Sequence, residues 1–230
     1  MERGTYHIIT KLLDTGIPVD LILLDLAKAF DKVPHRRLCI KLLSAGLNQM
    51  MVNWLMCFPT KCTQRVKLFG SDGHKIYFKP CNIISNVPQG TVLGPTLFLI
   101  YINDLGTRVS NNITLFADDS KLFGPAHSAS IQANLDHINK WAEEWLLSFN
   151  ISKCCILRFR PKNENIVYSM WDPEKQTRID LQTHNEERDL GVLVDNQLKF
   201  HSHIRNMVSK SNTGLGLLKR SITSRSPSLS

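Results

Sequence analysis

The stretch Phe116-Ala117-Asp118-Asp119 places two adjacent carboxylates between two short apolar runs, 113–116 and 121–124. Alternating β-forming residues on both sides of a polar pair indicate a hairpin with the acids at its tip. Adjacent acids repel each other, and a bound cation would explain their place beside apolar strands, because Mg²⁺ takes oxygen ligands from one or two carboxylates. An ordinary solvated Asp-Asp turn is the alternative, which the doublet by itself does not exclude.

A third acid lies far upstream. Asp25 ends the nearly continuous apolar run 19–24, which has the length of a buried strand. A carboxylate at this point could cap the segment that follows. Alternatively, the strand end and the hairpin tip bring three carboxylates together, and such a cluster can hold two metal ions about 3.5–4 Å apart for an in-line phosphoryl displacement.

Four segments occur in order along the chain: 24–35 (LDLAKAFDKVPH), 87–95 (VPQGTVLGP), 98–105 (FLIYINDL) and 115–120 (LFADDS). Together they resemble the palm of a reverse transcriptase from a non-LTR (LINE-type, jockey-like) retrotransposon. The resemblance runs over about residues 12–220. It implies an α+β fold of the right-hand polymerase palm type, with partial fingers and a thumb-like C-terminal region. Helices and strands without a regular βαβ alternation fit such a fold.

The resemblance implies roles for individual residues. Asp25, Asp118 and Asp119 match the catalytic, metal-binding acids, which implies two Mg²⁺ ions, for which Mn²⁺ can substitute. The metals would lower the pKa of a primer 3′-hydroxyl and neutralise charge on the triphosphate and the leaving pyrophosphate. Phe30 matches an aromatic residue that crowds the sugar 2′ position and selects deoxynucleotides. From the residues alone, Phe30 could instead be a core aromatic at the start of a helical segment.

Further positions resemble substrate contacts of the family. Gln89 and Gly90 match residues along the nascent base pair and the template strand, where glycine allows close backbone approach and glutamine can donate and accept hydrogen bonds. A loop and helix start is the alternative for this segment. Lys153 matches a lysine near the leaving pyrophosphate, and a solvated lysine after a helix is its alternative. Residues 188–192 resemble the hairpin that grips the primer end.

The charge of the chain is consistent with nucleic acid as a partner. Lys and Arg number 28 against 20 Asp and Glu, a formal net charge of +8, and residues 196–230 contain basic residues but no acid. Basic side chains neutralise phosphates and release counterions, so binding should weaken with salt. The resemblance implies an RNA template, a DNA primer and deoxynucleoside triphosphates as partners. A solvated basic face is the alternative for the C-terminal charge.

Several features limit the class of protein. No run reaches about 18 apolar residues, so no membrane helix is expected, and the first residues lack the apolar core of a signal peptide. We therefore expect an intracellular protein, in the nucleus or cytoplasm and not secreted. The six cysteines include no Cys-x-x-Cys pair, and no Cys/His cluster has zinc-finger spacing. The cysteines are expected to be free thiols.

The expected organisation is a palm with partial fingers over residues 1–195, the start of a thumb-like basic region over 196–220, and a disordered tail over 221–230. Helices are predicted over 6–15, 35–45, 48–58, 96–105 and 203–219, with another that begins at Ser128 or Ser130 and has its buried stripe over 131–149. Strands are predicted over 155–159, 166–171 and 190–194, and a hairpin over 65–78.

Two functional hypotheses follow. The first is RNA-directed DNA polymerisation by two-metal nucleotidyl transfer. Because the family's fingers lie mostly upstream of Asp25 and the chain begins shortly before it, we expect a truncated polymerase. The alternative is a catalytically inactive, retroelement-derived remnant that binds nucleic acid through its basic C-terminal region. Asn86 stands where the family usually has glycine; if that position needs a positive φ, asparagine is the least harmful replacement.

Overall fold

A five-stranded sheet forms the centre of the computed structural model, which describes residues 2–60, 62–71, 73–87, 90–126, 128–160 and 166–221. The strand order is β11-β8-β1-β7-β6, with β1 in the middle and antiparallel to both of its neighbours. β11 joins β8 in parallel. The strands of this sheet are β1 (Val19–Asp25), β6 (Asn112–Phe116), β7 (Asp119–Pro125), β8 (Cys155–Phe159) and β11 (Gln182–His184).

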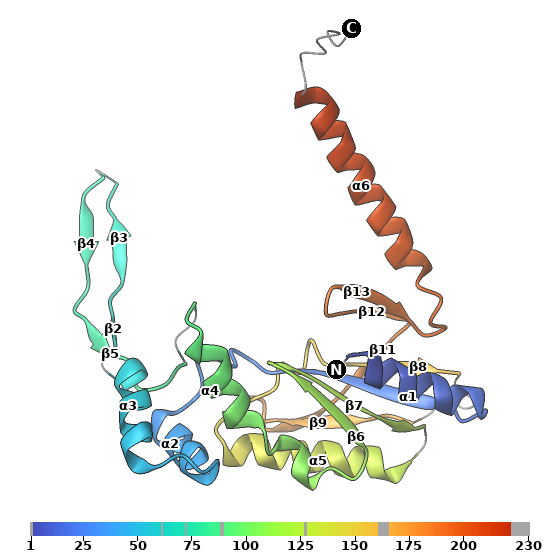
Figure 1. Cartoon of the computed structure of the whole chain (residues 1–230), viewed down its shortest axis with the longest axis horizontal. Coiled ribbons are helices and arrows are strands. Elements are labelled where there is room, and N and C mark those ends of the chain that lie inside the picture. Colours follow the sequence, from blue (N-terminus) through green and yellow to red (C-terminus); the bar gives the residue numbers. More distant parts are fainter. Residues whose placement is uncertain are drawn as a thin grey trace, which may run out of the picture.

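Helices and small two-stranded units surround the sheet (Figure 1). The helices are α1 (Glu2–Asp14), α2 (His35–Ser44), α3 (Gln49–Thr60), α4 (Leu93–Ile102), the 3-10 helix η1 (Leu105–Arg108), α5 (Ala129–Glu144) and α6 (His201–Ser221). The two-stranded units pair β2 (Thr63–Gln64) with β5 (Cys81–Asn82), β3 (Lys67–Phe69) with β4 (Lys75–Tyr77), β9 (Ser169–Asp172) with β10 (Thr177–Asp180), and β12 (Glu186–Asp189) with β13 (Val192–Asp195).

The two faces of the sheet are covered by different elements. Ile22 and Leu24 of β1 belong to the main core cluster, which includes buried residues of α2, α3, α4 and α5. Val19 and Leu21 belong to a smaller cluster with residues of α1 and β13. Because successive side chains of a strand point to opposite faces, Asp25 shares the α1 face with Val19 and Leu21.

Most predicted elements are present. The helices predicted over 6–15, 35–45, 48–58 and 203–219 correspond to α1, α2, α3 and α6, and the strand over 155–159 is β8. The hairpin predicted over 65–78 is formed by β3 and β4. The stripe on α5 is buried, as predicted, through Ile131, Leu135 and Ile138. The helix predicted over 96–105 begins earlier, at Leu93, and η1 follows it from Leu105.

Two predicted strands are present but begin later than predicted. The strand predicted over 190–194 begins at Val192, because Leu190 and Gly191 have φ values of 44° and 90° and form the turn between β12 and β13. Positive φ at both central residues is typical of a type I′ hairpin turn. The strand predicted over 166–171 is formed by Ser169–Asp172 instead. Of the tail predicted over 221–230, Ser221 ends α6 and the rest lies outside the described residues.

Two extensions project from the body of the molecule. The β2–β5 arm and α6 rise at opposite ends of the molecule, on the side of the β12–β13 hairpin and away from α5 (Figure 1). α6 contains no acidic residue, and none of its residues is buried. Within the described ranges, no helix combines the length and the apolar character needed to cross a membrane.

Candidate active site

The pairing of β1 with β7 brings two of the three predicted acids side by side. Asp25 and Asp119 are register partners at the end of β1 and the start of β7. Side chains of directly opposite residues lie on the same face of a sheet, with Cβ atoms about 4.5–5.5 Å apart. Asp118 precedes Asp119 in the two-residue turn between β6 and β7, where Phe116 pairs with Asp119. The acids therefore lie at the tip of a hairpin, as the sequence predicts.

The turn that carries Asp118 has an unusual backbone conformation. Ala117 has a φ of 52°, in the left-handed region. For a residue with a Cβ this conformation costs roughly 1–2 kcal/mol. Such residues persist where the surrounding structure imposes them, and they cluster at functional sites. Here the ladder of β6 and β7 imposes the turn and so determines the position of Asp118.

The acids repel one another. Burial raises the pKa of Asp119, and the neighbouring charges of Asp118 and Asp25 raise it further. Like charges directly opposite each other in a sheet are destabilising. A divalent cation among the three carboxylates would remove this repulsion. The donors are all carboxylate oxygens, which suit hard ions such as Mg²⁺ and Mn²⁺.

Lys153 lies against Asp25, its Nζ 3.4 Å from the Asp25 Oδ2. Its loop is tied to the end of β1, because the Asn150 amide donates to the Asp25 carbonyl over 2.8 Å. The Asp25 amide in turn donates to Cys154 Sγ over 3.5 Å. Burial raises the pKa of the Cys154 thiol to about 11, so this sulfur stays neutral beside the carboxylate. The lysine side chain is 64% exposed, so it is both solvated and paired with a candidate metal ligand.

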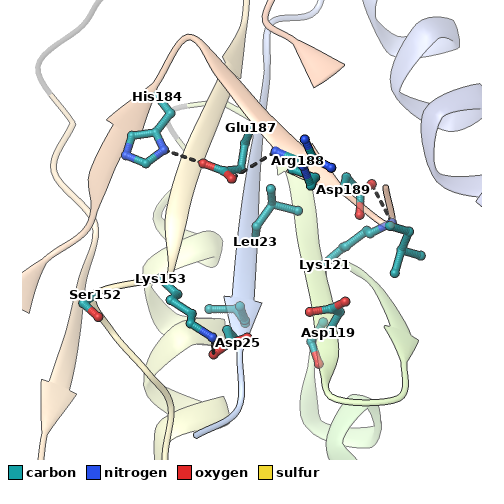
Figure 2. Close-up of a pocket in the computed structure, with 13 residues that line it drawn as sticks. Leu23, Asp25, Asp119, Lys121, Ser152, Lys153, His184, Glu187, Arg188 and Asp189 are labelled. Carbon is teal, nitrogen blue, oxygen red and sulfur yellow. Dashed lines mark hydrogen bonds and ion pairs between the residues drawn. The ribbon is translucent and has the colours of Figure 1, made fainter. Parts of the chain in front are cut away.

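A cavity of about 340 Å³ opens between these acids and the β12–β13 hairpin (Figure 2). Asp25, Asp119 and Lys153 line its lower part, and Glu187 and Asp189 line its upper part. The hairpin expected to contact a primer end therefore forms one wall of the cavity that contains two of the acids.

A buried ion pair that was not predicted from the sequence holds this hairpin on the sheet. Lys121 Nζ of β7 lies 2.6 Å from Asp189 Oδ2 of β12, and the two side chains are 2% and 4% exposed. The Tyr6 hydroxyl of α1 donates to the same carboxylate. The sequence contained one indication of it: the two-residue period of β7 puts Lys121 on the same face of the sheet as Asp119.

The other predicted substrate-binding residues lie elsewhere. Among the described residues that line the cavity, neither Phe30 nor Gly90 is present. Phe30 packs on the main core and stacks on Phe98, with ring centroids 4.7 Å apart. Phe30 is therefore a packed aromatic residue, as its alternative interpretation predicted. Gly90 is exposed and has a φ of 77°, which favours glycine. Gln89 lies outside the described residues.

Asn86 and Val87 are nevertheless tied to the segment that follows β1. The Val87 amide donates to the Phe30 carbonyl over 2.8 Å, and a ring nitrogen of His35 lies 3.2 Å from the Asn86 carbonyl oxygen. Asn86 does not have a positive φ, so the concern that this position needs glycine does not apply here. These contacts place Asn86 and Val87 next to the segment that follows Asp25.

Known proteins of one family resemble the chain. A model of the family described as reverse transcriptase (RNA-dependent DNA polymerase) matches residues 17–203. The chain is 30% identical over 197 residues to the RNA-directed DNA polymerase from mobile element jockey of Drosophila melanogaster, and 29% identical over 201 residues to that of Drosophila funebris. Each comparison covers 80% of this chain, and the chain spans only 20% of each relative.

Solved structures of low sequence identity share the fold. Telomerase from Candida tropicalis, in apo form and truncated from its C-terminal domain, matches with a TM-score of 0.52. The same telomerase in complex with a TWJ fragment of telomeric RNA matches with a TM-score of 0.54. Both are 10% identical, and the matches cover 84% of this chain and 37% and 32% of those chains. The expected α+β fold of the polymerase palm type is thereby confirmed.

Proposed function

The chain belongs to the reverse transcriptase (RNA-dependent DNA polymerase) family, and we propose that it catalyses template-directed nucleotidyl transfer as part of a non-LTR retrotransposon polymerase. The observation that carries the proposal is the register of β1 and β7, with Asp25 opposite Asp119 and Asp118 in the adjoining turn. The substrates would be deoxynucleoside triphosphates, with RNA as template and DNA as primer.

The three carboxylates fit a pair of Mg²⁺ ions, because they offer only oxygen donors and because the charges of Asp118 and Asp25 raise the pKa of Asp119. When bound, such ions would lower the pKa of the primer 3′-hydroxyl and neutralise the triphosphate. The 3′-hydroxyl would release its proton to solvent, and its oxygen would form a bond to the α-phosphorus while the bond from that phosphorus to the pyrophosphate breaks. Asp25, Asp118 and Asp119 would hold the metal ions whose positive charge this exchange needs.

Lys153 would act on the leaving group. Its ammonium lies 3.4 Å from Asp25, and its exposed side chain is free to turn from this carboxylate towards a phosphate. A cation at that place would neutralise the charge that develops on pyrophosphate. A solvated Lys153 can have this role, because its side chain must move each time pyrophosphate leaves and a new triphosphate binds.

The proposed nucleotide contacts lie beyond the acids. Phe30 would crowd the sugar 2′ position, and Gln89 and Gly90 would border the nascent base pair and the template. The hydrogen bond between Val87 and Phe30 supports a common site for them, because it joins the two segments that carry these residues. The positive φ of Gly90 supports close backbone approach at that point.

The wider proposal assigns residues 1–195 to a palm with partial fingers and 196–220 to the start of a thumb-like region. The β2–β5 arm and α6 rise on the same side of the molecule as the β12–β13 hairpin (Figure 1). A template–primer duplex held between two such extensions would pass over the end of β1. Basic side chains on α6 would then contact phosphates.

Primer extension tests the catalytic proposal. On an RNA template with a DNA primer, Mg²⁺ and deoxynucleotides, we expect Asp118→Asn and Asp119→Asn each to lower the extension rate by more than about 10²-fold, the loss seen when one electrostatic contact to a transition state is removed. Asp14→Asn, an exposed acid on α1, is the matched control and should extend normally. Undiminished extension by Asp119→Asn would reject the site.

A second candidate function is nucleic-acid binding without catalysis. It is favoured by α6, which has no acidic and no buried residue and contains Arg205, Lys210, Lys219 and Arg220. In that case the folded chain would extend no primer, and its salt-sensitive binding would be indifferent to the Asp118 and Asp119 substitutions. Extension by the unsubstituted chain would reject this alternative.

A further inference from the structure

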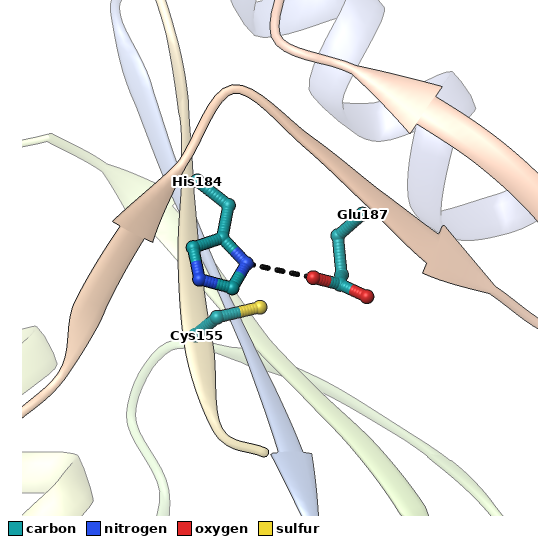
Figure 3. A group of neighbouring side chains, drawn as sticks. All are labelled: Cys155, His184 and Glu187. Carbon is teal, nitrogen blue, oxygen red and sulfur yellow. Dashed lines mark hydrogen bonds and ion pairs between the residues drawn. The ribbon is translucent and has the colours of Figure 1, made fainter. Parts of the chain in front are cut away.

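We propose that Cys155, His184 and Glu187 form a site for Zn²⁺ or a similar transition metal ion, separate from the acids. Each residue offers one donor atom, and the three donor atoms lie within 4.8 Å of one another (Figure 3). Nothing in the proposed polymerase chemistry uses these residues. The site stands whether or not the chain extends a primer.

The topology of the sheet brings the three residues together. β8 and β11 are parallel, with Cys155 opposite Gln182 and Leu157 opposite His184. Because side chains of one strand alternate between faces, Cys155 and His184 point to the same face of the sheet. The chain then turns into β12, and Glu187 lies beside His184 with its carboxylate towards the imidazole ring (Figure 3). No such cluster was predicted from the sequence, because Cys155 is separated from the other two by a segment that contains β9 and β10.

The donors are already oriented. His184 Nδ1 lies 2.7 Å from Glu187 Oε2, so two of the proposed donor groups already face each other, and a bound ion would replace this contact. The other carboxylate oxygen, Oε1, accepts a hydrogen bond from the Arg188 amide over 3.0 Å. Hydrogen bonds to the far side of a ligating group fix its direction, and such supporting partners are typical of metal sites. Glu187 can thus offer Oε2 to a metal ion and keep its support through Oε1.

The donor set selects a particular class of ion. Sulfur, imidazole nitrogen and one carboxylate oxygen suit Zn²⁺, whereas Mg²⁺ takes oxygen donors. Three protein ligands leave a fourth position of a tetrahedral ion for water or another ligand. His184 and Glu187 line the 340 Å³ cavity, so that position would face the cavity. One cavity would then be lined by Asp25 and Asp119 of the hard-ion site and, on its opposite wall, by two ligands of a softer site.

A nucleophilic cysteine is the competing interpretation of the same three residues, and the surroundings of Cys155 argue against it. The side chain is buried, and burial raises the pKa of the thiol to about 12. A nucleophilic cysteine needs a lowered pKa. A metal ion that binds here would displace the thiol proton into solvent and take the thiolate as a ligand.

Titration of the full chain with Co²⁺, followed by absorption spectroscopy under reducing conditions, tests the proposal. We expect a saturable thiolate-to-cobalt charge-transfer band with one equivalent bound, and displacement of Co²⁺ by Zn²⁺. Cys155→Ser should abolish the band. His184→Gln and Glu187→Gln should each lower Co²⁺ affinity by more than about tenfold, because substitution of supporting partners alone costs about 10–100-fold.

Two controls make the result specific. Cys57→Ser, at an exposed cysteine of α3, should keep both the band and the affinity. Asp119→Asn should also keep them, which separates this site from the candidate Mg²⁺ site. Absence of the charge-transfer band in the unsubstituted chain would overturn the proposal. A band that persists in Cys155→Ser would also overturn it. So would an unchanged Co²⁺ affinity in His184→Gln, because His184 is exposed and its substitution should leave the fold intact.

Discussion

Phe30 packs on the core, and in the proposed function the same ring would also select the sugar of the incoming nucleotide. One side of its ring stacks on the fully buried Phe98, and the residue as a whole is only half-buried. Stacking fixes the ring's position, while the exposed part can exclude a neighbouring 2′-hydroxyl. A rigid ring is suited to such steric selection because an aromatic side chain has few rotamers.

We expect Phe30→Val to raise the ratio of ribonucleotide to deoxynucleotide incorporation by about tenfold or more, in the range that size-based pockets achieve. Single-nucleotide extension with each substrate measures this ratio. Phe98→Leu is the packing control, because it disturbs the same stack without shortening the selecting side chain. If both variants change the ratio equally, or neither does, Phe30 is a packing residue and no more.

At the scale of elements, one buried ion pair couples three parts of the chain. Lys121 belongs to β7, Asp189 to β12, and Tyr6 of α1 donates to the Asp189 carboxylate. Removal of one partner from a buried pair leaves an uncompensated charge in the interior. The β12–β13 hairpin therefore depends on a contact that lies far from it in the sequence.

We expect Lys121→Met to lower the free energy of unfolding by about 3–5 kcal/mol, because Asp189 keeps its buried charge and loses its partner. Urea denaturation followed by circular dichroism measures the change. Lys175→Met is the matched control: Lys175 pairs with Asp172 at 3.8 Å with its side chain 68% exposed, and such surface pairs contribute about 0–1 kcal/mol. Equal effects of the two substitutions would contradict the structural role of the pair.

The start of α6 depends on a single carboxylate. Asp195 at the end of β13 accepts hydrogen bonds from the amides of Gln197 (2.9 Å), Lys199 (3.2 Å) and Phe200 (2.5 Å). Burial alone would raise the pKa of Asp195, but the amides of Lys199, Phe200 and Gln197 hold it below the usual value of 3.8. The carboxylate therefore fixes the direction in which the chain leaves the body.

We expect Asp195→Ala to lower the free energy of unfolding by about 0.5–2 kcal/mol, the range for loss of a helix-capping side chain. Because the folded pKa is depressed, the charged group stabilises fully above its unfolded pKa, and this stabilisation is lost as the pH falls through the folded value. The difference in free energy of unfolding between Asp195→Ala and the unsubstituted chain should thus become smaller below about pH 4. Denaturation at several pH values measures it; Asp195→Asn, which keeps an acceptor, should show a smaller cost. A gap that is independent of pH would contradict the prediction.

At the scale of the whole molecule, charge and shape act together. α6 carries basic residues without acids, contacts β13 through its first turn, and has no buried residue. The opposite side of the molecule is formed by α5 (Figure 1). A polyanion should therefore bind on the side from which α6 projects.

We expect a triple substitution to Gln at Lys210, Lys219 and Arg220 to weaken RNA binding and to reduce the slope of log K against log salt by about 0.7–0.9 for each phosphate that is no longer neutralised. Fluorescence anisotropy at several salt concentrations measures the slope. The matched control changes Lys11, Lys140 and Lys175 to Gln, which removes the same charge from exposed positions outside α6. Equal slopes for the two triple variants would contradict a dedicated surface on α6.

Local sequence patterns were sufficient to predict several elements of this protein and its family. The two-residue period around 113–124 predicted the hairpin and the place of Asp118 and Asp119 at its tip. The apolar run 19–24 predicted the buried strand that ends at Asp25, and the ordered motifs indicated the family. These features depend on neighbours in the sequence, so the residues themselves carry the information.

Only the tertiary structure decided which distant residues meet. The register of β1 and β7 set Asp25 against Asp119, and a buried contact joined Lys121 to Asp189. The parallel pairing of β8 with β11 brought Cys155 to His184 and Glu187. No local period encodes such contacts, because register and the packing of separate strands result from burying the apolar surface of the whole chain at once.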